Sequence, residues 1–387
     1  MSWLLVKFEE VTLPAKGSIV SGPFGSNIGS RFFVEEGVPV IRGNNLTFGQ
    51  RHFIDDGFVF LTEEKAQQFR NCEAIAGDLI FTAAGTIGQV GIIPPDTRFD
   101  RYIISNKQLR VRCDRSKANP LFLFLWFTTP EMRQHIINKN TGSTIPLINL
   151  SILRNLPVPL PPLHVQDQIA DILSTYDDLI ENNRCRMALL EESARLLYQE
   201  WFVWLRFPGY EHTRIVDGVP EGWERMTLGD RVALNYGKAL KADDRIEGPF
   251  PVYGSSGVVG SHEKALVQGP GIIVGRKGNV GSVYWCAKDF YPIDTVYFID
   301  AVTSNLYLYY ALKHMHFIST DVAVPGLNRD FAYSRPLIVP TEVILCTFLE
   351  SVSPIYEQIN KLEEINVKLR AARDLLLPRL MSGEIAV

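Results

Sequence analysis

Two stretches of the chain carry apolar residues with the spacing of a long amphipathic helix. In the first stretch, the apolar or special positions are Val165, Ile169, Ile172, Tyr176, Leu179, Asn183, Arg186 and Leu190. In the second, they are Leu345, Phe348, Val352, Ile355, Ile359, Leu362, Asn366, Leu369, Arg373 and Leu376. Alternating steps of three and four place such side chains along one face of a helix, as in the seam of a coiled coil. The pattern therefore predicts two long helices that pair with each other.

The two helical patterns also align with each other. Ile172 aligns with Ile355, and the same phase then brings Asn183 onto Asn366. A polar Asn in a seam costs stability but fixes register and pairing. The predicted seam residues are Ile172, Tyr176, Leu179, Asn183, Ile355, Ile359, Leu362 and Asn366. The alternative is that each helix only covers the core of its own domain.

The remaining sequence is a diverged duplication. Similar segments recur in the same order in both halves, although the loops between them differ in length. The matched segments are 3–8 with 223–228, Pro39-Val40 with Pro251-Val252, 79–88 with 272–281, 146–149 with 325–328, and 157–161 with 336–340. An ordered series of matches indicates two related domains. In a chain with two copies related by a two-fold axis, the long helices run antiparallel and form a spacer. From Val165 to Trp204, about 40 residues would span about 60 Å.

Short β-rich runs broken by Gly, Asn and Pro fill each globular part, followed by a short apolar helix around 121–126 or 306–312. This pattern predicts α+β domains without revealing the order of their strands. The proline-rich link 156–162 precedes the first long helix, and Phe207-Pro208-Gly209 ends it. The expected parts are a first domain at 1–160, a long helix at 161–207, a second domain at 208–342 and a long helix at 343–387.

Composition narrows the class of protein. Apolar residues make up 46% of the 387 residues, which suffices for two cores. No run of 18 uncharged apolar residues is present, and acidic residues follow the N-terminus too soon for a signal peptide, so we expect a cytoplasmic protein without a membrane segment. Five widely separated cysteines, without a CxxC pair, argue against a disulfide framework and against a zinc site.

Charge is distributed unevenly along the chain, whose net charge is −4. Residues 1–160 hold 17 Lys and Arg against 14 Asp and Glu, so only this part is basic, at +3. Because phosphate neutralisation dominates non-specific affinity for DNA, the chain alone should bind DNA weakly. If DNA is the ligand, partner subunits supply much of the backbone contact.

The sequence lacks the motifs of the enzymes that act on DNA. It contains neither the Asn/Asp-Pro-Pro-aromatic nor the Pro-Cys turn of a methyltransferase, and no Gly-x-x-x-x-Gly-Lys nucleotide loop. No catalytic or metal-binding residue is therefore predicted, and no cofactor is expected in this chain. The glycine-rich segments 85–88 and 275–281 suit either tight turns or phosphate contacts.

Side chains that can read bases cluster in polar loops. Arg and Lys suit guanine, whereas Asn and Gln suit adenine. The candidates in the first domain are Arg42, Asn44, Asn45, Arg51, His52, Lys139, Asn140 and Ser143. Those in the second are Tyr253, Ser255, Ser256, Arg276, Lys277, Asn279, Asn328 and Arg329. Each one alone also suits a solvated turn, but as sets in equivalent loops they form a plausible reading surface.

Four segments resemble the specificity (S) subunits of type I restriction–modification systems. The segment from Glu181 to Gly209 is similar to that family's central conserved region, and the tail from Leu369 to Ile385 is similar to its distal counterpart. PVYGSSGVVG and VPEGWE are also typical of the family's target-recognition domains. No individual base contact carries over, because the recognition loops of the family vary freely.

The resemblance implies an α+β fold of two duplicated α/β target-recognition domains. Two long conserved helices would separate them as an antiparallel coiled coil with pseudo-two-fold symmetry. It also implies that the chain reads a split site in double-stranded DNA, docks two methyltransferase (M) subunits that bind S-adenosylmethionine, and joins restriction (R) subunits in the full complex. Two alternatives are a non-catalytic interaction scaffold without base-specific reading, and a self-contained methyltransferase or nuclease.

Overall fold

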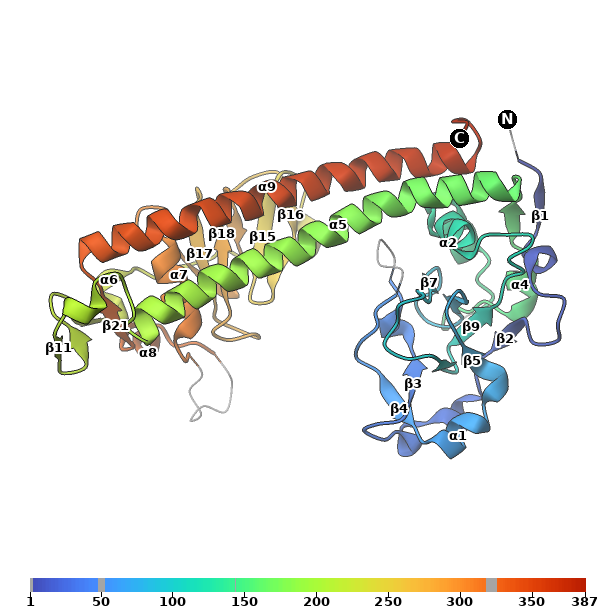
Figure 1. The fold of residues 1–387 in the computed structure, drawn as a ribbon, viewed down its shortest axis with the longest axis horizontal. Coiled ribbons are helices and arrows are strands. Elements are labelled where there is room, and N and C mark those ends of the chain that lie inside the picture. The colour runs from blue at the N-terminus through green and yellow to red at the C-terminus, as the bar shows by residue number, and fades with distance from the viewer. Residues whose placement is uncertain (1–2, 48–52, 143, 318–325) are drawn as a thin grey trace. The chain divides into compact units, whose positions relative to one another are not determined.

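The computed structural model describes residues 3–47, 53–142, 144–317 and 326–387, which form two compact units (Figure 1). Unit 1 combines Met1–Asn182 with Asn366–Val387, whereas unit 2 is the continuous stretch Asn183–Ile365. Helix α5 (Leu163–Tyr198) begins in unit 1 and ends in unit 2, and helix α9 (Glu342–Met381) does the reverse. Unit 1 is therefore built from two separate segments of the chain.

Unit 1 contains two small sheets, with strand orders β2-β9-β6-β7 and β4-β3-β8-β5, and the separate pair β1-β10. Its strands are β1 (Leu5–Lys7), β2 (Ile19–Ser21), β3 (Val38–Ile41), β4 (Val59–Leu61), β5 (Glu73–Ala74), β6 (Leu79–Thr82), β7 (Val90–Ile92), β8 (Tyr102–Ile104), β9 (Gln108–Val111) and β10 (Pro157–Pro159). Its short helices are α1 (Glu63–Gln67), α2 (Pro120–Thr128), α3 (Pro130–Asn138) and α4 (Leu150–Arg154).

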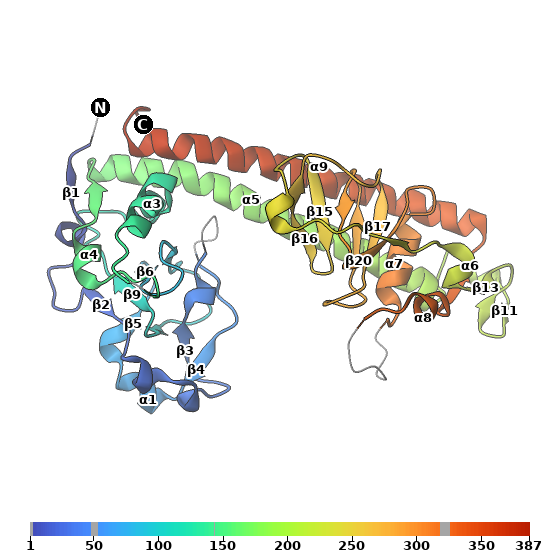
Figure 2. The same cartoon turned by 180° about the vertical axis from the view of Figure 1, so that it is seen from behind.

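Unit 2 contains sheets with strand orders β14-β20-β17-β18 and β16-β15-β19, and the pairs β13-β21 and β11-β12. Figure 2 labels strands from each of these four groups. Its strands are β11 (Ile215–Val216), β12 (Val219–Pro220), β13 (Glu224–Thr227), β14 (Asn235–Tyr236), β15 (Phe250–Gly254), β16 (Gly257–His262), β17 (Gly271–Gly275), β18 (Val283–Cys286), β19 (Tyr291–Pro292), β20 (Val296–Ile299) and β21 (Pro336–Val339). Its short helices are α6 (Leu228–Arg231), α7 (Leu306–His314) and α8 (Arg329–Tyr333).

The two units share one topology. In unit 1, β6 pairs antiparallel with β7 and β9, and β3 pairs antiparallel with β4 but parallel with β8. In unit 2, β17 pairs in the same way with β18 and β20, and β15 with β16 and β19. The predicted duplication is confirmed, and the fold is that of two related α+β domains.

Each core lies between a sheet and helices that the sequence makes apolar. In unit 1, α2 reads PLFLFLWFT; Asn119 caps its N-terminus by accepting from the amides of Leu121 and Phe122. The Phe127 ring of this helix lies 4.6 Å from that of Phe8 and 5.1 Å from that of Phe81 on β6. Burying a Phe side chain of this kind contributes about 1.5–3 kcal/mol. This packing fixes the sheet against the helices.

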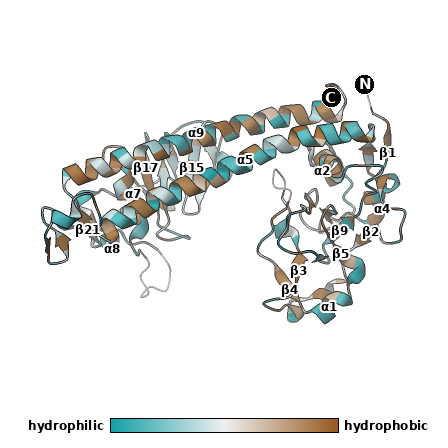
Figure 3. Ribbon diagram, viewed as in Figure 1, coloured by the Kyte–Doolittle hydropathy of each residue, from teal (hydrophilic) through white to brown (hydrophobic). Residues whose placement is uncertain are grey.

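Within each unit, segments of α5 and α9 pack against each other and against the domain core. In unit 1, Asp177 contacts Arg373, and the side-chain amide of Asn366 donates to the Ile180 carbonyl at 3.3 Å. The numbers fall along α9 as they rise along α5, so the two segments run in opposite directions. Both helices also contribute side chains to the core of unit 1, so they cover that core as well as contacting each other. Both ribbons alternate between apolar and polar residues along their length (Figure 3).

Two of the predicted seam positions on α5 are wrong. Ile172 and Leu179 are 37% and 48% exposed, whereas their neighbours Leu173 and Ile180 are buried. Adjacent residues on a helix lie about 100° apart, so an apolar pair such as Ile172-Leu173 leaves the buried member undecided in the sequence. Packing against α2 and α9 selects Leu173.

The other predicted seam residues are buried to different degrees. Asn183, Leu362 and Asn366 are buried. The half-buried ones are Tyr176, Ile355 and Ile359.

Candidate nucleic-acid interface

In both units a glycine turn lies next to the segment that leads into a short helix. Gly85 and Gly88 follow β6, Gly278 and Gly281 follow β17, and all have φ between +77° and +92°. This left-handed conformation suits glycine, since other residues carry a Cβ that clashes there. Backbone bridges join Ala84 to Leu147 in unit 1 and Lys277 to Gly326 in unit 2. Segments far apart in the sequence therefore meet at each turn.

In unit 1, the polar loop after β3 is held together by its own side chains. Asn45 is fully buried; its amide donates to the carbonyls of Ile54 (3.0 Å) and Asp56 (2.9 Å) and accepts from the Arg42 amide (2.9 Å). The DNA contact predicted for Asn45 is therefore replaced by a structural role. Asn44 is exposed, Arg42 is half-buried, and each donates to the Gly57 carbonyl at 3.4 Å.

The second polar loop of unit 1 follows α3. The side-chain oxygen of Asn140 accepts from the amides of Gly142 (2.9 Å) and Leu147 (2.8 Å), so this Asn shapes the loop. Lys139 is exposed at the end of α3. The candidates Arg51, His52 and Ser143 lie outside the described residues.

In unit 2, the candidates at the end of β15 divide into buried and exposed residues. Tyr253 and Ser255 are each 9% exposed, and burial raises the pKa of Tyr253. The carbonyl of Ser255 accepts from the hydroxyls of Ser282 (2.6 Å) and Tyr284 (3.2 Å). These contacts fix the end of β15 against the turn after β17. Tyr253 and Ser255 are therefore buried residues that hold the exposed loop in place. Ser256 is exposed.

The turn after β17 and the start of α8 bring a group of cations together. Asn328 is exposed and caps α8 by accepting from the amides of Asp330 (2.7 Å) and Phe331 (3.3 Å), which fixes the start of the helix at Arg329. Lys277, Asn279 and Arg329 are exposed, and Arg276 is half-buried.

Arg276 and Arg329 share an aromatic ring with which they form what we call the Tyr236 cluster, comprising Tyr236, Arg276, Tyr297 and Arg329. Each guanidinium carbon lies 5.3 Å from the centroid of the Tyr236 ring. The Tyr297 ring lies 5.0 Å from that ring, and burial raises the pKa of Tyr297 to about 12. A cation over an aromatic face is attracted by the ring quadrupole. The cluster therefore presents two oriented arginines.

Sequence reasoning missed Tyr236 as well as Asn106 and Lys107. Tyr236 stands in the polar segment Asn235-Tyr236-Gly237-Lys238, where an aromatic residue beside a lysine was the available signal. Asn106 and Lys107 form an exposed turn between β8 and β9, and the Lys107 carbonyl accepts from the Ala83 amide at 2.7 Å. That bond places this polar turn beside the glycine turn of unit 1.

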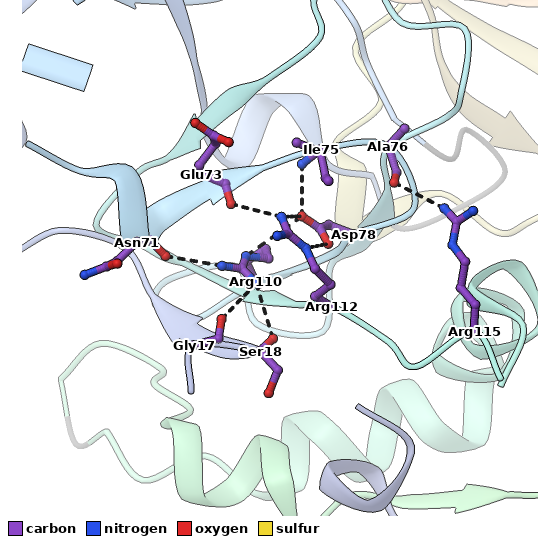
Figure 4. Close-up of polar contacts among 10 residues, drawn as sticks. All are labelled: Gly17, Ser18, Asn71, Glu73, Ile75, Ala76, Asp78, Arg110, Arg112 and Arg115. Carbon is purple, nitrogen blue, oxygen red and sulfur yellow. Dashed lines mark hydrogen bonds and ion pairs between the residues drawn. The ribbon is translucent and has the colours of Figure 1, made fainter. Parts of the chain in front are cut away.

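A group of charged side chains in unit 1 consists of Asp78, which directly precedes β6, and of Arg110 and Arg112, on β9 and directly after it (Figure 4). Asp78 is 1% exposed and accepts from the Arg112 guanidinium at 2.8 and 2.7 Å and from the Ile75 amide at 2.9 Å. Arg110 is 4% exposed; it donates to the carbonyls of Gly17 (3.0 Å) and Asn71 (3.2 Å). Burial lowers the pKa of Arg110, whereas the bond to Asp78 raises that of Arg112. The network ties β6 and β9 to neighbouring segments and serves the fold.

The described residues contain no group of three or more His, Cys, Asp or Glu side chains arranged to hold a metal ion. Among the helices of this same part of the chain, none combines the length and apolar character that crossing a bilayer requires.

Comparison with known proteins gives a consistent result. A family model described as the type I restriction modification DNA specificity domain matches residues 32–192 and 220–340, a part of both units. The chain is 24% identical to the type I restriction enzyme MjaIX specificity subunit of Methanocaldococcus jannaschii, over 90% of this chain and 87% of that protein. It is also 24% identical to the HindI specificity subunit of Haemophilus influenzae, over 75% of this chain and 83% of that protein.

Among solved structures, the crystal structure of the type I restriction–modification S subunit from M. genitalium aligns with a TM-score of 0.58. The alignment covers 98% of this chain and 96% of that one at 17% sequence identity. This likeness shows a shared fold.

Proposed function

Because this chain belongs to the type I restriction–modification DNA specificity family, we propose that it reads a split DNA sequence, unit 1 recognising one half-site and unit 2 the other. The observation that carries this proposal is one topology repeated with different residues in its loops. Arg276 and Lys277 follow β17, whereas Ala83 and Ala84 follow β6 at the equivalent places. Two domains with one scaffold and different loops are suited to reading different base sequences.

The long helices are the proposed spacer between the two readers. In this proposal α5 and α9 form an antiparallel coiled coil with pseudo-two-fold symmetry, and their length sets the gap between the half-sites. The opposite directions of the helices at Asp177–Arg373 and Ile180–Asn366 support this arrangement.

The chain is proposed to be non-catalytic and to dock methyltransferase and restriction subunits. In this view S-adenosylmethionine binds to the M subunits, in the cytoplasm. Docking along the two helices is supported by the apolar side chains that each of them exposes. These are Leu163, Ile172, Leu179, Leu189 and Leu196 on α5, and Val343, Ile365, Val367 and Leu375 on α9.

Exchange of one domain tests the proposal. Residues 1–155 would be replaced by the equivalent domain of a related chain, the hybrid produced with its M subunits, and the methylated sites mapped by single-molecule sequencing. We expect one half-site to change while the other half-site and the gap stay the same. A change in both half-sites would contradict independent readers. If the unaltered complex showed no sequence preference, the interaction scaffold would be favoured instead.

A further inference from the structure

In the Tyr236 cluster, aromatic rings and a backbone carbonyl contact the guanidinium groups of the two arginines. The Arg276 guanidinium donates to the Asp294 carbonyl at 2.6 Å and lies 5.3 Å from the Tyr236 centroid and 5.8 Å from that of Tyr297. Arg329 lies against Tyr236 (5.3 Å) and Tyr333 (6.0 Å). Among the residues that the structure describes, neither guanidinium is paired with a carboxylate.

The strand registers show what unit 1 carries at the same places. In unit 2, Val274 pairs with Tyr297, and Tyr297 pairs with Tyr236. In unit 1, Phe81 pairs with Leu109, and Leu109 pairs with Ser21. Tyr236 therefore corresponds to Ser21, and Tyr297 corresponds to Leu109.

The two arginines are replaced in unit 1 as well. Arg276 follows β17 where Ala83 follows β6, and Arg329 follows the cap Asn328 where Leu150 follows the cap Asn149. All members of the cluster are thus absent together from the first copy of the fold. Because unit 1 has the same topology without these four residues, the fold itself does not require them.

Two residues of the Tyr236 cluster, Tyr236 and Arg329, lie outside the core of unit 2. Tyr236 is 53% exposed and Arg329 is exposed. Two guanidinium groups at one ring, without a carboxylate partner among the described residues, together present several hydrogen-bond donors and two positive charges. The cluster is therefore arranged for a ligand that accepts hydrogen bonds.

Resting on the proposed reading of a split site, we propose that Arg276 and Arg329 read guanine in the half-site recognised by unit 2, with Tyr236 as their positioning residue. The planar fork of a guanidinium matches O6 and N7 of guanine in the major groove. The nearby Tyr236 ring and, for Arg276, the bond to the Asp294 carbonyl orient the fork in advance, which suits base reading better than contact with a phosphate. Lys277, an exposed point charge beside Arg276, suits a phosphate.

The test uses the chain assembled with its M subunits and duplexes carrying its mapped sequence. In one set of duplexes, 7-deazaguanine replaces each guanine of the second half-site in turn, which removes the N7 acceptor. For the unaltered complex we expect one or two of these replacements to weaken binding by roughly 5- to 10-fold, at the lower end of the value of a bidentate pair, because the O6 acceptor remains. The variants Arg276→Ala and Arg329→Leu introduce the residues that unit 1 carries at the equivalent positions. Each variant should bind normal DNA and DNA with 7-deazaguanine with similar affinity, when the replaced guanine is the one that the missing arginine reads.

Two variants test whether the aromatic ring of Tyr236 positions the arginines. Tyr236→Ser, the residue of unit 1, should lose guanine discrimination, whereas Tyr236→Phe should keep it. The other half-site should be unaffected in both variants, an outcome that a general loss of folding would not produce. Lys288→Ala, which removes a cation paired with Glu364 at 3.4 Å, is the matched control and should leave guanine discrimination unchanged.

Three outcomes would overturn the inference. They are a second half-site without a G·C pair, an unaltered complex that is indifferent to 7-deazaguanine there, and variants that lose affinity equally for all sequences. The last would be accompanied by a salt dependence that falls by about one unit of slope per arginine, which identifies phosphate contacts. Failure of the broader proposal is distinguishable, because the unaltered complex would then methylate no split sequence at all.

Discussion

At the scale of single residues, the buried network around Asp78 is the most sensitive point of unit 1. Its carboxylate is enclosed with two guanidinium groups, of which Arg110 is buried and Arg112 is 32% exposed. Removing one member of a buried ion pair leaves the other charges without compensation, which costs about 3–5 kcal/mol. We expect Asp78→Asn to destabilise unit 1 by about 3 kcal/mol, near the lower end because Arg112 retains some solvent.

Urea denaturation followed by circular dichroism measures this effect. Glu192→Gln, which breaks the exposed ion pair with Arg195, is the control and should leave the midpoint unchanged. An unchanged midpoint for Asp78→Asn would contradict the prediction, because it would mean that Arg110 and Arg112 do not need the Asp78 carboxylate to compensate their charges.

Residue type alone did not distinguish readers from supports. Asn45, Asn140 and Asn328 were predicted as readers because an amide suits adenine. All three bond to nearby backbone groups, but only Asn45 is buried by these contacts, whereas Asn140 and Asn328 stay exposed. A short amide side chain serves both purposes, and only the surrounding backbone decides between them. Tyr236 was missed for the opposite reason, because its partners Arg276, Tyr297 and Arg329 come from distant parts of the sequence.

At the scale of elements, the helices show which face of α5 is buried. Leu173 is fully buried in the core of unit 1, whereas its neighbour Ile172 is 37% exposed. We expect Leu173→Ala to lower the free energy of unfolding by about 2–5 kcal/mol, through lost burial and a cavity. Ile172→Ala should change it by less than about 1 kcal/mol. Chemical denaturation of both variants measures the two changes. A larger loss for Ile172→Ala than for Leu173→Ala would support the seam position predicted from the sequence.

The existence and spacing of the elements were largely predictable. Glycines and prolines at strand ends keep their order in both halves, since turns and helix boundaries need them, and this revealed the duplication. Strand order was not predictable, because β3 pairs in parallel with β8 about 60 residues later and nothing local encodes that choice. Adjacent apolar residues likewise concealed whether Ile172 or Leu173 faces inward.

At the scale of the whole molecule, the proposed spacer makes a prediction about DNA geometry. Four residues inserted near Asn183 in α5, with a matching insertion near Asn366 in α9, would lengthen the helix pair by about 6 Å. Since successive base pairs are about 3.4 Å apart, we expect the gap in the methylated site to grow by about two base pairs. Methylation mapping of the variant with its M subunits provides the measurement. An unchanged gap would show that the helices do not set the distance between half-sites.

The division of the chain into units also orders its biosynthesis. Unit 2 is one uninterrupted stretch, but the core of unit 1 includes Leu377, Leu380 and Met381 near the end of the chain. On the ribosome, the core of unit 1 therefore cannot close until residues 366–387 have been made, whereas all residues of unit 2 are available before then. A nascent chain that stops short of residue 366 exposes apolar surface on the earlier half, and such surface attracts chaperones and proteases.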